Sequence, residues 1–241
     1  MLKSSVVFFS VCVVLVSGQN WVSTSYVLDH EQFFTDVLQE TMYELERREW
    51  CNLKTDNIYQ TISDSLYNFF VNGTVMYHNG FLVSIQKIDL TNIQGSLSST
   101  TDSETNITTN FANVRGNLNL RDVKIGFDVV VTLHNDGVES VQTYTGIYNH
   151  ALVQYQLSIQ KNLNTEAIST GSSLMSLQAG SGVRMIYMPS NNVTEALSRR
   201  WVPSNNWNGV GRWGSGHMAP IVEEIVTTRI PFPGICIGCY A

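Results

Sequence analysis

The stretch Val114–Leu133, VRGNLNLRDVKIGFDVVVTL, decides the fold because apolar side chains alternate along it. In its second half every second residue is apolar, which places six side chains on one face of a strand: Val123, Ile125, Phe127, Val129, Val131 and Leu133. Upstream, Leu118 and Leu120 have the opposite parity. The alternation therefore shifts near Arg121 and Asp122, where an extra, bulged residue would bend the strand. Strands usually have about 5 to 6 residues, so this length predicts a large, curled antiparallel sheet.

Two segments before this strand have apolar residues at helical spacing. Tyr26–Arg48 has Asp29 available as a helix cap, and its apolar positions are Phe34, Leu38, Met42 and Leu45. Asp56–Phe70 repeats the pattern at Ile58, Ile62, Leu66 and Phe69. We predict a long amphipathic helix for the first segment, and a second helix or a bent continuation for the other.

Asn-Gly and Gly-rich turns after residue 72 predict antiparallel hairpins, because their residues readily adopt positive φ. The first predicted hairpin joins Thr74–Tyr77 to Phe81–Ile88 through the turn His78-Asn79-Gly80. The second joins the long strand to a return strand that reaches Ile147, through the turn Asn135-Asp136-Gly137. The third joins Leu174–Gln178 to Val183–Tyr187 through the turn Gly180-Ser181-Gly182. Ala151–Ile159 alternates as cleanly as the first strand. The polar Ser96–Asn110 is expected to border solvent, with a turn at Thr101–Glu104.

The C-terminal third begins after Pro189, which is expected to close the sheet. Asn192–Arg200 is a candidate short helix, and helical spacing returns from Met218 to Val226. Between them, segment 202–216 is rich in Pro, Asn and Gly and is predicted to be irregular, with Trp201, Trp207 and Trp213 at intervals along this part of the chain.

The N-terminus has the pattern of a secretory signal peptide over residues 1–18. Lys3 is followed by an apolar centre, Val6–Val16, and by the small-residue cleavage pattern Val16-Ser17-Gly18. No later stretch reaches the roughly 20 apolar residues of a membrane helix. We therefore expect no transmembrane segment and a soluble, secreted, extracellular protein, with residues 19–241 as a single domain that ends in a cysteine-containing tail.

Composition argues against several classes of function. A net charge of −6, with only 14 Lys and Arg residues, gives no basic patch for nucleic acid. The histidines are not at metal-ligand spacing, and the GxGxxG pattern at 209–214 follows no strand and opens no βαβ unit. Neither Ser181 nor Ser215 fits a nucleophile elbow. We expect no catalytic residues, no metal site and no cofactor, and hence not an enzyme.

Three cysteines remain after the signal peptide, an odd number for an oxidising compartment: Cys51, Cys236 and Cys239. Redox chemistry and half a zinc site are alternatives for the Cys-x-x-Cys pair, and we favour a structural disulfide from the tail to Cys51. Three sequons make candidate glycosylation sites of Asn72, Asn106 and Asn192.

The order of N-terminal helix, Asn-Gly hairpin into FLVSIQKIDL, the long NLNLRDVKIGFDVVVTL strand and its return resembles the arthropod group 7 mite allergen-like proteins. These are relatives of the juvenile-hormone-binding and takeout proteins, within the tubular lipid-binding fold of bactericidal permeability-increasing protein. The resemblance covers roughly residues 26 to 187. It implies an α+β fold in which a long, strongly curved antiparallel sheet wraps around a long amphipathic helix and encloses an apolar cavity.

The resemblance also implies a function and a site. The chain would be a non-enzymatic binder or carrier of a hydrophobic small molecule or lipid. The sheet residues facing the helix would be Phe127, Val129, Val131, Val153, Tyr155 and Leu157, and the helix residues would be Phe34, Leu38 and Leu45. Ile221 and Ile225 would close one end of the cavity. The alternative is a cavity-free recognition protein that meets a protein partner or a microbial surface through its outer face, with the Trp-rich segment as the contact.

Overall fold

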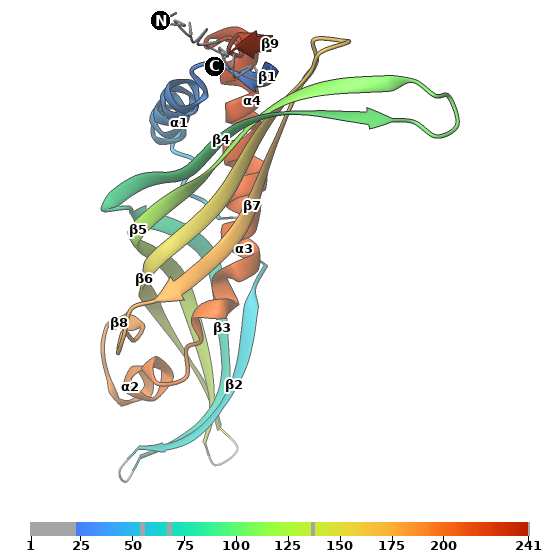
Figure 1. The fold of residues 1–241 in the computed structure, drawn as a ribbon. Coiled ribbons are helices and arrows are strands. Elements are labelled where there is room, and N and C mark those ends of the chain that lie inside the picture. The colour runs from blue at the N-terminus through green and yellow to red at the C-terminus, as the bar shows by residue number, and fades with distance from the viewer. Residues whose placement is uncertain (1–22, 54–55, 67–68, 136–137, 241) are drawn as a thin grey trace, which may run out of the picture.

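The computed structural model describes residues 23–53, 56–66, 69–135 and 138–240. Long antiparallel strands run along an elongated molecule, and helices pack against them (Figure 1). The structure is therefore α+β and mostly antiparallel sheet, as predicted. The predicted signal peptide, residues 1–18, lies outside the described residues.

Two strands form the centre of the sheet, and shorter strands follow one another along both of their outer edges. The central strands are β5 (Thr108–Asn135) and β6 (Val138–Asn162), which pair along almost their whole length. The other edge of β5 pairs with β3 (Phe69–Ser84) and then β4 (Lys87–Thr101), and β2 (Ile58–Leu66) pairs with β3. The other edge of β6 pairs with β7 (Ile168–Ala179) and β8 (Ile186–Met188), while β1 (Ser23–Val27) and β9 (Ile235–Tyr240) form a separate small sheet.

The predicted change of alternation in β5 is confirmed at Arg121 and Asp122, which are both exposed. Asp122 has a positive φ of 50°, yet the pairing register of β5 with β6 is the same on both sides of it. Opposite these residues, Ala151 and Leu152 of β6 are both half-buried. The two central strands thus change phase together, and no extra residue is inserted between them.

The helices are α1 (His30–Arg47), α2 (Asn192–Ser198), and a helical run made of η1 (Pro203–Asn206), α3 (Trp207–Trp213), the π-helical turn η2 (Gly214–Met218) and α4 (Ala219–Thr228). The first and last confirm the predicted helical spacing, and α2 confirms the short helix. The prediction of an irregular segment at 202–216 is wrong. Each glycine in a helix interior costs about 1 kcal/mol relative to alanine, and burial of side chains such as Val210 and Trp213 outweighs that preference.

The predicted helix at Asp56–Phe70 is also wrong, because this segment forms β2 and the start of β3. Residues four apart, such as Ile58 and Ile62, share a face in a strand as well as in a helix, so the spacing does not distinguish the two. Similarly, Tyr26 lies in β1 rather than in the first helix.

Two of the predicted hairpin turns lie elsewhere in the topology. Asn79 and Gly80 form a bulge inside the continuous strand β3, where Asn79 has a φ of 52°. Gly180–Gly182 separates β7 from β8, but both of those strands pair with β6 and not with each other. The β5–β6 hairpin is confirmed by the pairing of Asn135 with Val138, and the solvent-bordering strand by the exposed end of β4.

The core lies between one face of the sheet and the helices. Gly116 in β5 allows α1 to approach closely, because a Cβ atom there would lie 2.7 Å from the ring of Phe34. Gly214 of η2 likewise allows the C-terminal helical run to approach the sheet, because a Cβ atom there would lie 2.5 Å from the ring of Tyr155. The hydroxyl of Tyr155 donates to the carbonyl of Val210 at 2.7 Å. These approaches fix α1 and the C-terminal helical run on the sheet.

Candidate ligand-binding groove

An apolar groove of about 750 Å³ lies between the end of α1 and the junction of β3 with β4. We name it the α1–β3 groove and define it by its lining residues: Met42, Tyr43, Leu45, Glu46, Glu49, Trp50, Cys51, Leu82, Val83, Ser84, Ile85, Ile88 and Trp213. Its volume is within the range of about 300–1,000 Å³ that is usual for small-molecule sites.

Backbone hydrogen bonds hold the segment after α1 in place along one wall of the groove. The amide of Trp50 donates to the carbonyl of Leu45 at 3.1 Å, and the amide of Leu82 donates to the carbonyl of Cys51 at 2.7 Å. From the helical run, Trp213 Nε1 donates to the carbonyl of Trp50 at 2.8 Å. Three separate parts of the chain therefore position the aromatic wall.

The opposite wall is formed where β3 ends and β4 begins. Ser84 pairs with Lys124 and Lys87 pairs with Arg121, so the break between β3 and β4 lies directly across from Asp122. The change of alternation that the sequence predicts in β5 thus coincides with the place where β3 ends. The unpaired corner at Ile85 contributes apolar side chains to the groove.

Several exposed apolar side chains gather in the groove. Tyr43, Val83 and Ile88 are 59%, 44% and 43% exposed, and all three line it. Exposed apolar side chains scattered singly are ordinary, but their collection in one concavity is typical of a binding surface. Glu46 and Glu49 provide polar groups at the same site.

An ion-pair network fixes the end of α1 against α4. Glu44 is only 3% exposed and accepts hydrogen bonds from Arg47, Arg229 and Arg48. These bonds, with the one from Arg47 foremost, lower the pKa of Glu44 to about 2. Arg48 also donates to Glu224 of α4 at 2.7 Å. The network holds the turn of α1 that carries Met42 and Leu45, and with it one wall of the groove.

All eleven predicted cavity residues are buried in the core, but the structure divides them among separate places. Phe34 lies over Gly116, whereas Phe127 packs against Tyr77 and Trp201. Gly116 and Phe127 are eleven positions apart on one strand, which corresponds to roughly 35 Å. The expectation that Phe127 faces Phe34 is therefore wrong.

Only Leu45 among those eleven residues lines the α1–β3 groove. Trp50 and Trp213 were not predicted as site residues, because Trp50 lies just beyond the end of the first helix and Trp213 lies in the segment expected to be irregular. The parity shift at Arg121 and Asp122 was the available signal, since it lies opposite the break between β3 and β4 beside which the groove opens.

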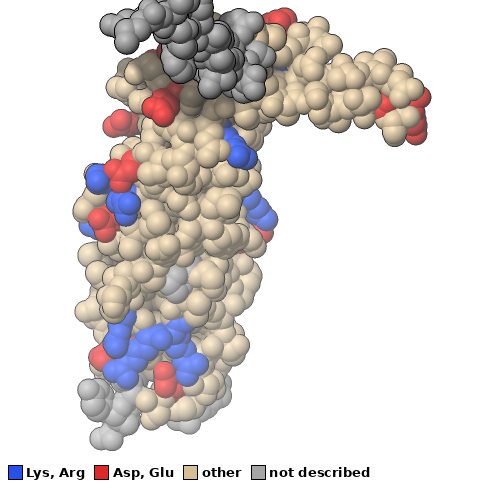
Figure 2. Space-filling model, viewed as in Figure 1, with Lys and Arg blue, Asp and Glu red and all other residues tan. Residues whose placement is uncertain are grey.

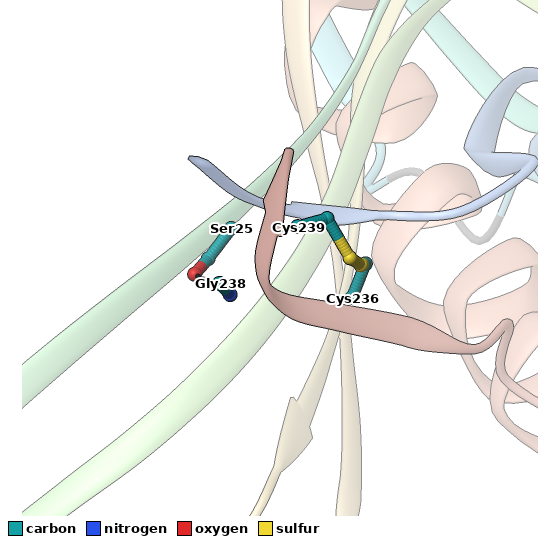
Figure 3. The surroundings of a disulfide bond; sticks show 4 residues. All are labelled: Ser25, Cys236, Gly238 and Cys239. Carbon is teal, nitrogen blue, oxygen red and sulfur yellow. Dashed lines mark hydrogen bonds between the residues drawn. A yellow bond between two sulfur atoms is a disulfide. The ribbon is translucent and has the colours of Figure 1, made fainter. Parts of the chain in front are cut away.

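The predicted disulfide from the tail to Cys51 is wrong, because Cys236 pairs with Cys239 (Figure 3). Cys51 is free and exposed. The paired cysteines lie in β9, where the amide of Gly238 donates to Ser25 Oγ of β1 at 3.1 Å. Of the sequon residues, Asn106 and Asn192 are exposed and Asn72 is half-buried in β3. Glycosylation of these three residues stays a prediction.

Comparison with known proteins gives little further information. No protein-family model matches the chain, and no curated protein matches it. A solved structure of a lipopolysaccharide binding protein is similar with a TM-score of 0.40 and 10% identity, over 85% of this chain. The chain spans 40% of that structure's length. This similarity is too low to support an argument about function. Within the described residues, no helix is both long and apolar enough to cross a membrane, and no three potential metal ligands form a cluster.

Proposed function

We propose that this chain is a secreted, non-enzymatic binder or carrier of a hydrophobic small molecule or lipid, and that the α1–β3 groove is its binding site. The observation that carries the proposal is the collection of partly exposed Tyr43, Val83 and Ile88 around a concavity of about 750 Å³. Burying such surface against an apolar ligand stabilises a complex by about 25 cal/mol per Å². Under this proposal the ligand lies between α1 and the sheet, beside the break between β3 and β4 and outside the packed core.

A fluorescence titration tests the proposal directly. Trp50 and Trp213 both line the groove, so binding of an apolar ligand changes their emission. We expect a fluorescent fatty-acid analogue to bind saturably at one site per chain, and unlabelled lipid to displace it. Ile88→Gln adds a polar group to an exposed part of the wall and should weaken binding. Absence of saturable binding to the folded protein would refute the proposal.

A second candidate function is recognition of a partner through the outer surface. The hairpin formed by the ends of β4 and β5 projects from the molecule, and its turn exposes Ile107 at 62% (Figure 1). Asp102 and Glu104 make the end of this arm acidic (Figure 2). Of the three tryptophans in or beside the Trp-rich segment, which was the contact first expected, Trp201 and Trp213 are buried and Trp207 is 42% exposed. Shortening the turn should abolish partner binding under this alternative and leave lipid binding unchanged.

A further inference from the structure

The charged side chains that line the α1–β3 groove all carry the same sign. They are Glu46 and Glu49, and both are exposed. Among the described residues that line the groove, none is a lysine, an arginine or a histidine. The charged head group of an amphiphilic ligand would therefore meet carboxylates at this site and no basic side chain.

Neither carboxylate forms an ion pair or a side-chain hydrogen bond within the described part of the chain. The two arginines between them in the sequence, Arg47 and Arg48, both bind Glu44 instead, at 2.6 and 3.0 Å. Glu44 is 3% exposed, whereas Glu46 and Glu49 are open to solvent. Both negative charges of the groove are thus available to a ligand.

The charges around this end of the groove do not cancel these two. The ion-pair network between α1 and α4 holds equal numbers of carboxylates and guanidinium groups: Glu40, Glu44 and Glu224, with Arg47, Arg48 and Arg229. The C-terminal end of a helix carries about half a negative charge, and α1 ends at Arg47, just before Glu49. The excess charge at this end is therefore negative, which attracts a cation.

The opposite wall does not present a basic side chain to the groove. Lys87 precedes Ile88 in β4, but its ammonium group binds Asp89 at 3.0 Å, and Arg121 binds the same carboxylate at 2.6 Å. Neither Lys87 nor Arg121 lines the groove, and Lys124 of β5 also lies outside its lining. The charge of the groove is thus set by its α1 wall.

On α1 the apolar and the acidic residues of the groove share one face of the helix. Met42, Leu45 and Glu46 are three and four positions apart, which makes them neighbours on the helix surface. Met42 and Glu46 are separated by about 6 Å along the helix axis. The face therefore changes from apolar to negatively charged within about one turn, which suits a molecule with an apolar chain and a positive head group.

We propose that the α1–β3 groove selects amphiphiles with a positively charged head group, such as alkylamines. The alkyl chain lies against Met42, Leu45 and Ile88, and the ammonium group pairs with Glu46 and Glu49. This inference rests on the function proposed for the groove, to which it adds the charge of the ligand. Exposed ion pairs are weak, so the selection is a preference of about fivefold over a neutral head group. A fatty acid still binds through its chain, but its carboxylate is repelled.

Titration calorimetry with decylamine, decanol and decanoate tests the preference, because the three molecules have chains of the same length and differ in charge. We expect decylamine to bind about fivefold more tightly than decanol, and decanol to bind more tightly than decanoate. Moderate sodium chloride should weaken decylamine binding and leave decanol binding nearly unchanged, because salt screens exposed charges. This salt series uses the wild-type protein, so it does not depend on whether a variant folds.

Glu46→Gln with Glu49→Gln removes both charges and keeps the size of the side chains. In this variant the three ligands should bind with affinities within about twofold of one another, and decanol should bind as it binds to the wild type. The matched control is Glu31→Gln with Glu104→Gln, which removes two exposed carboxylates at the start of α1 and in the turn after β4. The control should retain the wild-type order of affinities.

Two results would overturn the charge selection and leave the groove as a binding site. One is decylamine that binds no more tightly than decanol, and the other is an unchanged preference in the Glu46→Gln, Glu49→Gln variant. Failure of all three ligands to bind the folded wild-type protein would instead refute the proposed function, and the charge selection with it.

Discussion

Replacing Val83 and Ile88 with serine should weaken apolar ligands about 30-fold while leaving the fold intact. The two side chains are 44% and 43% exposed in the groove, so nearly half of each is available to a ligand. Complete burial of such a side chain stabilises by about 1.5–3 kcal/mol, so each contributes about 1 kcal/mol to binding and the pair about 2 kcal/mol. That difference corresponds to a factor of roughly 30 in Kd.

The matched control is Val141→Ser with Ile186→Ser. These residues are of the same types, are 64% and 63% exposed, and lie on β6 and β8 rather than in the groove. Kd is measured by titrating each variant with the fluorescent fatty-acid analogue, and thermal unfolding checks the fold. Equal affinity of wild type, groove variant and control would refute the placement of the ligand, and equal loss in both variants would show that the effect is not local.

Three further outcomes follow from the same structure. Val129→Trp should destabilise the protein by about 1–3 kcal/mol in chemical denaturation without reducing its affinity for the fluorescent fatty-acid analogue, because Val129 is 1% exposed in the core. Loss of binding at unchanged stability would instead indicate that the ligand lies beside Val129. The pKa of His150 is lowered by burial to about 4 in the folded state, against about 6.5 in the unfolded chain, so the free energy of unfolding should fall by about 3 kcal/mol as the pH decreases from 6.5 to 4. The His150→Phe variant should lack this pH dependence, so the free energies of unfolding of wild type and variant should diverge only between pH 4 and 6.5. Parallel curves would show that the pKa of His150 is not lowered by folding. A thiol reagent should modify Cys51 without prior reduction, and saturating apolar probe should slow the reaction, because Cys51 is free and lines the groove; labelling at the same rate with and without probe would place the probe elsewhere.

The long strands were predictable because alternation over many residues is a strong signal. The phase shift at Arg121 and Asp122 was also predictable, and it coincides with the positive φ of Asp122, but the inserted residue expected there is absent from the pairing of β5 with β6. What the alternation does not encode is which edges pair. β3 and β4 both pair with β5, and β7 and β8 both pair with β6, so neighbouring strands in sequence are placed end to end along a partner.

The groove was less predictable because it depends on contacts between distant segments. Trp50 and Trp213 are 163 positions apart and meet through one hydrogen bond. Apolar residues in the sequence look the same whether they fill a core or line a groove, which is why ten of the eleven predicted cavity residues belong to the packed interior away from the groove. The resemblance to group 7 mite allergen-like proteins stays a prediction for the same reason, since it rests on the pattern of the strands and not on a site.

The central claim is that the protein binds a hydrophobic molecule in the α1–β3 groove, and mass spectrometry of the intact protein secreted from eukaryotic cells tests it most directly. Under native conditions we expect the mass of the chain plus an apolar small molecule, which is released on denaturation and is present at lower occupancy in the Val83→Ser, Ile88→Ser variant. A wild-type protein that has only its own mass under native conditions, and that takes up no added fatty acid or lipid, would contradict the claim.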